Sequence, residues 1–280
     1  MPAIALLGSN GQLGRELAAV LPAENTRCLT RQEADIASAG HVTRLLHGLK
    51  PSLVINCTAY NLVDKAEDES DAAFAVNAFG VRELALACAT LNATLVHFST
   101  DYVFGLEGFR NEPYRESDAP GPVSTYGISK LTGEYFVRAI CPHHYIIRTC
   151  GLYGKHGAGG KGTNFVETML RLAKAGKPLK VVEDQVLTPT SARDVARAVP
   201  RLLEDCPFGV YHLTNSGQCS WYAFAAKIFQ LSGIEADLSP TTSAVYGSRA
   251  ARPCYSVLGT EHAAAPRLRS WQEALQEYLK

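Results

Sequence analysis

The chain lacks an excess of charge of either sign. Its 280 residues include 27 Lys or Arg and 27 Asp or Glu. A chain without a strongly basic or acidic balance is not typical of nucleic-acid-binding or membrane-surface proteins, so we expect neither nucleic acid nor a membrane as a partner. Charged residues make up 19% and hydrophobic residues 46% of the chain, which excludes a disordered protein and allows a sizeable core.

The sequence also lacks targeting, spanning and cross-linking signals. Residues 1–8 contain no basic stretch and no cleavage site of a signal peptide. No apolar run approaches the roughly 18–20 residues that a membrane helix needs. The eight cysteines are scattered and show no C-x-x-C spacing, which argues against a disulfide scaffold and a zinc site. We therefore expect a cytoplasmic protein, and we predict no metal.

The first half of the chain alternates short aliphatic runs with longer helical patterns. Strands are predicted at residues 3–7, 26–29, 53–56, 94–98 and 144–148, and helices at 11–20, 41–49, 71–91 and 126–139. This alternation predicts an α/β fold, a doubly wound parallel sheet of the Rossmann type with helices on both faces.

The pattern changes after about residue 150. A glycine-rich cationic stretch at 154–162 reads either as a lid over substrate phosphates or as a surface loop. Beyond it, helices are predicted at 164–175, 192–203, 221–232 and 271–279, and strands at 179–182 and 209–213. We predict a first domain at 1–150 and a smaller C-terminal domain at 151–280, with segments of about 180–215 returning to the first.

A glycine-rich turn lies between the first predicted strand and the first predicted helix. Residues without Cβ let the backbone approach a pyrophosphate, and the free N–H groups of a helix N-terminus attract its charge. At the first βα junction this pattern predicts an NAD(P)-binding first domain; a merely tight turn is the structural alternative. The residues assigned to the cofactor here are Gly8, Asn10, Gly11, Gln12, Leu13 and Gly14.

The end of the second predicted strand bears on the choice of cofactor. A site specific for NAD would carry an acid there, on the ribose 2′-OH, whereas this chain has Thr30-Arg31. A guanidinium can accept a 2′-phosphate, so we predict NADPH, with NADH as the alternative. A solvated loop cation is the other interpretation of Arg31. Asp35 and Ile36 are expected to hold the adenine edge.

The most informative segment runs from Ser124 to Lys130. Ser124 or Thr125 can cap a helix, which places Tyr126 and Lys130 one turn apart on one face. A phenol with an ordinary pKa near about 10 is a poor acid–base catalyst at neutral pH. We expect the neighbouring ammonium of Lys130 to lower that pKa towards the working range. Lys130 can also hydrogen-bond the nicotinamide ribose.

A hydroxyl that polarises a carbonyl should complete this set. Ser99 and Thr100 follow the strand predicted at 94–98, at the edge where open α/β sheets bind ligands. We assign Thr100 to catalysis with Tyr126 and Lys130, and Ser99 to the cofactor. A lone Y-x-x-x-K spacing is common, but together with the glycine turn it favours an NAD(P)H-dependent oxidoreductase.

These segments resemble the dTDP-4-dehydrorhamnose reductase family of extended short-chain dehydrogenases/reductases, over nearly the whole chain. The resemblance rests on the G-x-x-G-x-x-G turn, Ser99-Thr-Asp-Tyr-Val-Phe104, Tyr126-Gly-Ile-Ser-Lys130, Arg148-Thr149, Asn164-Phe165-Val166 and Arg252-Pro253. It implies hydride transfer to the C4 ketone of dTDP-4-dehydro-L-rhamnose to give dTDP-L-rhamnose, with Tyr126 as proton donor and Thr100 orienting the carbonyl.

The resemblance also assigns binding residues. It implies that Thr58, Ala59 and Tyr60 line the cofactor. It further implies that a nucleotide-sugar substrate contacts Thr100, Asp101, Tyr126 and Asn164. We expect a homodimer. Members of the family often have a Trp stacked on thymine where this chain has Gly151, and Tyr153 is the candidate substitute.

Two other functions stay open. One is another nucleotide-sugar enzyme, an epimerase or dehydratase, although a 4,6-dehydratase would want a Glu beside Asp101. The other is a non-catalytic regulatory subunit on the same fold, which would have no need of all three catalytic residues. The acidic run Glu67-Asp68-Glu69 is better explained as complementing a helix dipole than as catalytic carboxylates.

Overall fold

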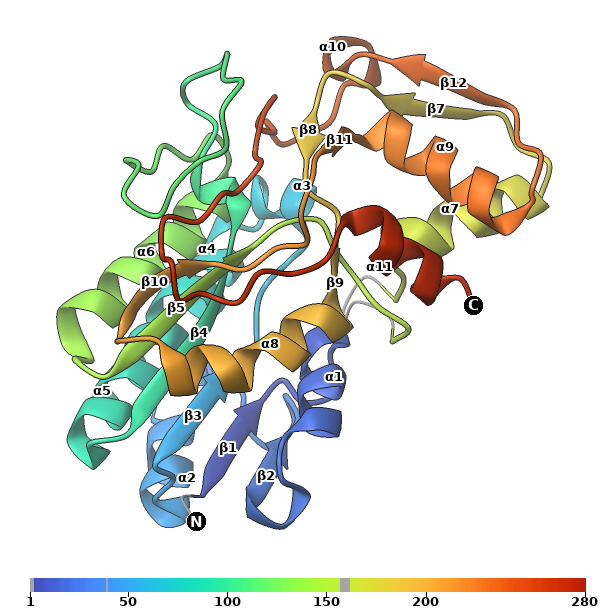
Figure 1. Cartoon of the computed structure of the whole chain (residues 1–280). Helices are drawn as coiled ribbons and strands as arrows, with labels where there is room; N and C mark the ends of the chain where they lie inside the picture. Colours follow the sequence, from blue (N-terminus) through green and yellow to red (C-terminus); the bar gives the residue numbers. More distant parts are fainter. Residues whose placement is uncertain (1–2, 39, 157–161) are drawn as a thin grey trace.

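A six-stranded parallel sheet forms the centre of the protein in the computed structural model, which describes residues 3–38, 40–156 and 162–280 (Figure 1). The strands are β1 (Ile4–Leu7), β2 (Thr26–Leu29), β3 (Leu53–Asn56), β4 (Thr94–Thr100), β5 (His144–Thr149) and β10 (Gly209–His212). Their order is β10-β5-β4-β3-β1-β2, and every neighbouring pair is parallel. The predicted doubly wound α/β fold is thereby confirmed.

Helices cover both faces of this sheet (Figure 1). On one face lie α1 (Gln12–Val20) and α8 (Ala192–Asp205), and on the other lie α2 (His41–Leu49), α5 (Val81–Leu91) and α6 (Thr125–Ile140). Successive residues of a strand point to opposite faces, so both must be apolar when both are covered. In β1, for example, Leu6 packs towards α1 and α8 while Leu7 packs towards α2 and α5.

The helix predicted at 71–91 forms in three consecutive pieces. These are α4 (Ser70–Phe74), a π-helical segment (Ala75–Gly80) and α5. By length and composition alone, Ser70–Leu91 is apolar enough to cross a membrane, so the expectation that no run reaches that length is wrong. Half of its apolar window is buried, and its segments pack against α2, α6 and β4, as a core helix does.

In the residues that the structure describes, the C-terminal region is built from short ladders and helices. It contains α7 (Phe165–Lys174), α9 (Trp221–Ser232), α10 (Ser243–Tyr246) and α11 (Trp271–Tyr278). Its ladders pair β7 (Leu179–Val182) with β12 (Leu238–Thr241), β8 (Val186–Leu187) with β11 (Cys219–Ser220), and β6 (Leu152–Tyr153) with β9 (Thr190–Ser191). A separate apolar cluster around Phe224 and Ile228 holds α7, α9 and β7 together.

The chain crosses between the two regions more than once. Helix α8 packs against α1, and β10 pairs with β5 at the edge of the large sheet, whereas β7 lies with β12 in the C-terminal region. The division near residue 150 stays a prediction. So does the lid interpretation of the glycine-rich stretch, because residues 157–161 lie outside the described ranges.

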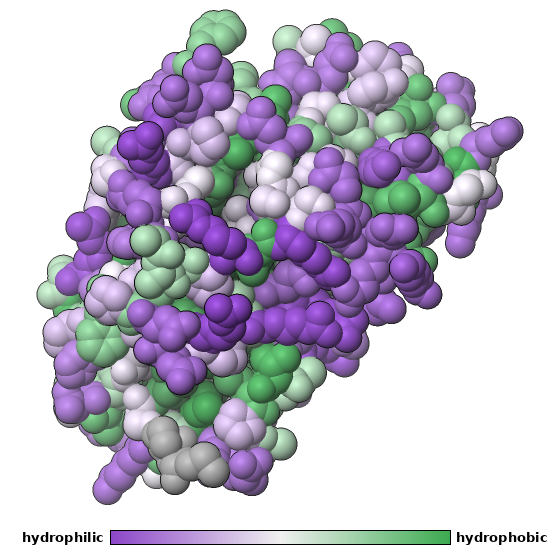
Figure 2. All heavy atoms as spheres, in the orientation of Figure 1, coloured by the Kyte–Doolittle hydropathy of each residue, from purple (hydrophilic) through white to green (hydrophobic). Residues whose placement is uncertain are grey.

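Hydrophilic side chains cover most of the face seen in the space-filling view, and hydrophobic atoms appear there only as separate patches (Figure 2). Most apolar residues of the central strands are instead buried between the sheet and its helices. A short helix, α3 (Val63–Ala66), follows β3 near the carboxyl ends of the strands. That edge of the sheet carries the candidate site.

Candidate active site

A cavity of about 910 Å³ lies at the carboxyl ends of β1, β3, β4 and β5. The strand order reverses between β1 and β3, and such a reversal leaves a crevice where open α/β sheets bind ligands. The residues that the sequence assigned to cofactor, substrate or catalysis line this cavity, with the exceptions of Gly14 and of Tyr153, the candidate for base stacking.

The glycine turn forms one wall of the cavity. Gly8 adopts a left-handed φ of 71°, which favours glycine, and Gly11 is the N-cap of α1. No acidic side chain lies in the first turn of α1, and Gly11 has no side chain to cap the helix. The first backbone N–H groups of α1 can therefore bind an anion. Gly14 acts indirectly, because a Cβ there would overlap the carbonyl oxygen of Gly8 and push α1 away.

Buried polar atoms without partners mark the same wall. Gln12 donates from Nε2 to the Leu152 carbonyl at 3.1 Å, while its Oε1 is buried without a partner among the described residues. The hydroxyl of Ser99 is likewise buried without a hydrogen-bond partner among the described residues, and both side chains line the cavity. A buried polar atom that lacks a partner destabilises the protein unless a ligand or water completes it. The glycine turn and these two groups fit a nicotinamide dinucleotide.

The predicted adenine end is formed by the segment after β2. The Arg31 side chain is 80% exposed and lies 3.7 Å from the Asp35 carboxylate. A second, more open hollow borders this end and is lined by Asn10, Thr30, Arg31, Gln32, Asp35, Ser38 and His41. Arg31 therefore lines both spaces, where a guanidinium is free to turn towards a 2′-phosphate.

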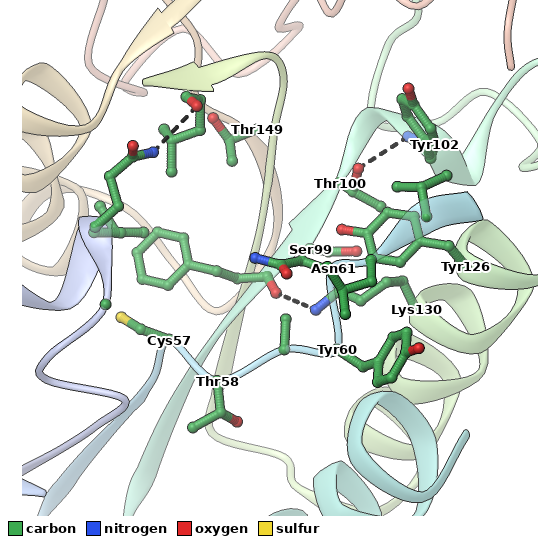
Figure 3. A pocket seen from close by; sticks show the side chains of 18 of the residues that line it. Cys57, Thr58, Tyr60, Asn61, Ser99, Thr100, Tyr102, Tyr126, Lys130 and Thr149 are labelled. Atoms are coloured by element: carbon green, nitrogen blue, oxygen red, sulfur yellow. Dashed lines mark hydrogen bonds between the residues drawn. The ribbon is translucent and has the colours of Figure 1, made fainter. Parts of the chain in front are cut away.

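The residues that the sequence assigned to catalysis meet where β4 ends and α6 begins. The Ser124 hydroxyl accepts a hydrogen bond from the Gly127 N–H at 3.2 Å and caps α6. A Cβ at Gly127 would overlap the Tyr102 carbonyl oxygen, so glycine lets α6 approach the end of β4. Figure 3 shows Thr100, Tyr126 and Lys130 gathered on one side of the pocket.

The electrostatics of this group differ from the expectation. Burial raises the pKa of Tyr126 to about 12, although a hydrogen bond with Thr100 opposes the shift. Burial lowers the pKa of Lys130 to about 8, and its Nζ donates to the Phe98 carbonyl at 2.7 Å (Figure 3). The prediction that Lys130 lowers the pKa of Tyr126 is wrong here, because desolvation of the phenolate is the largest cause of the shift and the interaction that opposes it comes from Thr100. Tyr126 therefore carries its proton at neutral pH.

Asn77, in the π-helical segment, was missed by the sequence reasoning. Its side-chain amide donates to the Tyr60 carbonyl and accepts from the Tyr60 N–H, both at 2.9 Å. It also donates to the Ser129 hydroxyl at 3.0 Å, and that hydroxyl donates to the Tyr126 carbonyl at 2.8 Å. The loop after β3 is thus tied to the first turn of α6. A buried amide inside an apolar helix was the available signal.

Two carboxylates position α6. Glu67 accepts hydrogen bonds from the N–H and the hydroxyl of Thr125, the first residue of α6, both at 2.9 Å. This member of the acidic run precedes α4 in the chain but binds the N-terminus of α6. Glu134 is buried and accepts from Arg148 on β5, with the shortest contact at 2.7 Å. The N-terminal end and the middle of α6 are therefore anchored to separate elements.

Asp101 and Asn164, both assigned to the substrate, have partners within the protein. The Asp101 carboxylate accepts from the Thr100 hydroxyl and from the Cys150 thiol, both at 3.0 Å, and burial raises its pKa. Asn164 caps α7 through the Glu167 N–H and donates to the Gly154 carbonyl at 2.7 Å. Both line the cavity, and their contact with substrate stays a prediction.

Tyr153 does not replace the aromatic ring that Gly151 lacks. It is 1% exposed, its ring packs against Phe224 and Tyr278, and it is not among the residues that line the cavity. The Tyr153 hypothesis is therefore wrong. Gly151 itself has a left-handed φ of 51°, and a Cβ there would lie 2.7 Å from a methyl of Leu187.

No cluster of three or more His, Cys, Asp or Glu side chains that could hold a metal occurs in the part of the chain that the structure describes.

Residues 2–280 match the family model described as the RmlD substrate binding domain. The spore coat polysaccharide biosynthesis protein SpsK of Bacillus subtilis is 41% identical over 284 residues, covering 100% of this chain and 98% of that protein. A dTDP-4-dehydrorhamnose reductase of Mycolicibacterium smegmatis is 40% identical, covering 98% and 84%. The crystal structure of dTDP-4-dehydrorhamnose reductase from Bacillus anthracis in complex with NADP superposes with a TM-score of 0.92 at 37% identity, covering 99% and 98%.

Proposed function

The chain belongs to the dTDP-4-dehydrorhamnose reductase family of NAD(P)H-dependent enzymes, and we propose that it reduces the C4 ketone of dTDP-4-dehydro-L-rhamnose to give dTDP-L-rhamnose. One observation carries the proposal. Thr100, Tyr126 and Lys130 line the same cavity as the glycine turn, so a carbonyl and a nicotinamide can be held together there. A regulatory subunit would have no need of that arrangement.

NADPH supplies the hydride when bound. The N-terminus of α1 and the glycine turn would hold its pyrophosphate, and Arg31 would face its 2′-phosphate. The loop at Thr58–Tyr60 would line its nicotinamide half, held in place by Asn77. Ser99 and Gln12 offer the polar atoms that have no partner among the described residues.

Tyr126 donates the proton in this proposal. As hydride adds to C4, the carbonyl oxygen gains negative charge and takes the phenolic proton of Tyr126, while the Thr100 hydroxyl turns from Asp101 towards that oxygen. The raised pKa of Tyr126 keeps the phenol protonated until then. The phenolate that forms lies one helical turn from Lys130, whose positive charge stabilises it before a proton returns from solvent.

A coupled assay tests the function directly. The dTDP-linked 4-keto sugar is supplied with NADPH, the loss of NADPH absorbance is followed, and the sugar product is identified. We expect turnover by the wild type and a loss of at least about 100-fold in Tyr126→Phe, since general acid catalysis contributes about 100- to 10,000-fold. No turnover by the wild type, or full turnover by Tyr126→Phe, contradicts the proposal.

A second assay distinguishes this reduction from the reactions of an epimerase or a dehydratase. The dTDP-linked 4-keto-6-deoxyglucose isomer is offered alone, without the epimerisation that would convert it into dTDP-4-dehydro-L-rhamnose. Turnover only after epimerisation supports the proposed substrate. Release of an epimer or a dehydrated sugar without consumption of NADPH supports an epimerase or dehydratase instead.

A further inference from the structure

The part of the cavity that lies in the C-terminal region has a different character from the catalytic end. Its described lining residues are Gly151, Leu152, Thr163, Asn164, Phe165, Gln185, Val186, Leu187, Trp221, Pro253 and Ser256. None of these residues carries a charge, so this wall does not offer a partner for a diphosphate. A flat, neutral and partly apolar group fits such a wall better.

We propose that the indole of Trp221 is the platform on which the base of the nucleotide sugar stacks, supported from behind by Phe165. This inference rests on the proposed function and identifies the residue that recognises the base. Aromatic side chains bind nucleobases through their π-faces, largely independently of base identity.

The local fold brings these groups together. β8 and β11 form an antiparallel pair in which Ser220 lies opposite Val186 and Cys219 opposite Leu187. The Ser220 hydroxyl caps α9 through the Ala223 N–H at 3.1 Å, so Trp221 is the first residue of the helix and follows directly on the ladder. The register therefore places Trp221 beside the wall formed by Val186 and Leu187.

A cluster of rings packs against Trp221, whose plane is tilted by 48° from that of Phe165. Its ring centroid lies 4.6 Å from that of Phe165, the first residue of α7. Phe165 in turn stacks on the fully buried Phe224, with centroids 5.5 Å apart and planes 14° from parallel. Trp221 is only partly buried and lines the cavity, so part of its ring is available to a ligand.

Gly151 keeps the space above Leu187 open. Its left-handed backbone disfavours any other residue, and a Cβ would lie 2.7 Å from the Leu187 side chain. Gln185 lines the same wall; its Nε2 donates to the Ser243 hydroxyl at 2.8 Å, and its amide oxygen can accept a hydrogen bond from the polar edge of a base. A ring can therefore lie against Trp221 with Leu187 beneath it and Gln185 at its edge.

The two tryptophans of the chain make this proposal testable by fluorescence. Trp271 is 5% exposed, packs edge-on against Phe224 and does not line the cavity. Trp271→Phe leaves Trp221 as the sole indole, and Trp221→Phe leaves Trp271. We expect dTDP to quench the emission of the wild type and of Trp271→Phe but not that of Trp221→Phe. Pyrophosphate, which has no base, should quench none of them.

Binding constants give the second readout. Trp221→Leu should weaken dTDP binding at least about 5-fold, because stacking on the ring is lost, while Trp221→Phe should keep most of it. Tyr222→Leu, one residue along α9 and outside the cavity lining, is the matched control and should bind dTDP like the wild type. NADPH affinity should be unchanged in all three.

Three outcomes overturn the inference: unchanged dTDP affinity in Trp221→Leu, no quenching in Trp271→Phe, or equal loss of dTDP and NADPH affinity in Trp221→Leu. An equal loss of both affinities would show that Trp221 only stabilises the fold and does not bind the base. A wild-type protein that binds no dTDP, and turns over no dTDP-sugar, contradicts the proposed function itself and is thereby distinguished from a failure at Trp221 alone.

Discussion

The buried ion pair between Glu134 and Arg148 gives the sharpest stability prediction. The two side chains are 1% and 2% exposed, and Arg148 reaches the carboxylate through contacts of 3.0, 3.2 and 2.7 Å. Two further contacts of the guanidinium in the described part of the chain are His212, at 3.4 Å, and the ring of Phe104, at 5.1 Å, and neither offers a negative charge. Glu134→Leu therefore leaves a desolvated cation without a counter-charge.

The expected cost follows from this burial. Removing one partner of a buried pair destabilises a protein by about 3–5 kcal/mol, a large part of a total of about 5–15 kcal/mol. Arg148→Met should cost less, because Lys130 lies one turn from Glu134 and already interacts with it electrostatically. The double variant should fall within about 2 kcal/mol of the wild type, since replacing both ions by apolar groups removes the desolvation penalty.

Urea unfolding of the four proteins provides the measurement. The double-mutant cycle should give a coupling free energy of at least about 2 kcal/mol, well above the value for independent sites. Glu134→Leu should also lower the pKa of Lys130 further below about 8, because the carboxylate raises that pKa. Additive losses, or a cost of Glu134→Leu below about 1 kcal/mol, would refute the reasoning.

The remaining predictions concern the cofactor and the chemistry. Gly14→Ala should destabilise the protein by about 1–3 kcal/mol and weaken NADPH binding, because the new methyl overlaps the turn; a fluorescence titration and a thermal melt check both, and wild-type values would contradict it. Thr100→Val should lower kcat by at least about 100-fold while Thr100→Ser retains most of it, so equal losses in the two variants would exclude a role for the hydroxyl. The kcat/KM for NADPH should decline as the pH rises through about 8, since Lys130 then loses the proton that makes it a cation; a flat profile up to about pH 10 would argue against a charged Lys130 in binding.

Local sequence signals were sufficient for much of the fold and for placing Thr100, Tyr126 and Lys130 in one cavity, whereas their catalytic roles stay a prediction. The turn from Gly8 to Gly14 and the helix that carries Tyr126 and Lys130 are each encoded by neighbouring residues, so their patterns can be read directly. Strand β3 has the predicted bounds because both faces of the sheet demand apolar side chains there, whereas β2, which also has the predicted bounds, lies at the edge of the sheet and buries only Leu29. Strand β12 was not predicted, since Pro240 lies inside it.

The properties that were missed depend on residues distant in sequence. The pKa of Tyr126 is set by burial that involves β4 as well as α6, so the spacing to Lys130 alone pointed in the wrong direction. Asn77 and Tyr60 are joined across 17 residues, and Phe165 meets Trp221 only because α7 and α9 pack together. Two-residue strands such as β8 are too short to show a periodic pattern.

The edge position of β10 has a consequence for how the protein is made. A ribosome releases the chain from its N-terminus, so β1 to β5 can assemble while the C-terminal residues are still being added. The last strand of that sheet is residues 209–212, which pair with Tyr145–Arg148. Until they emerge, β5 presents unpaired backbone groups to other nascent chains and is the point where misassembly would start. Translation that pauses between residues 150 and 212 should therefore lower the yield of native protein more than a pause placed after β10.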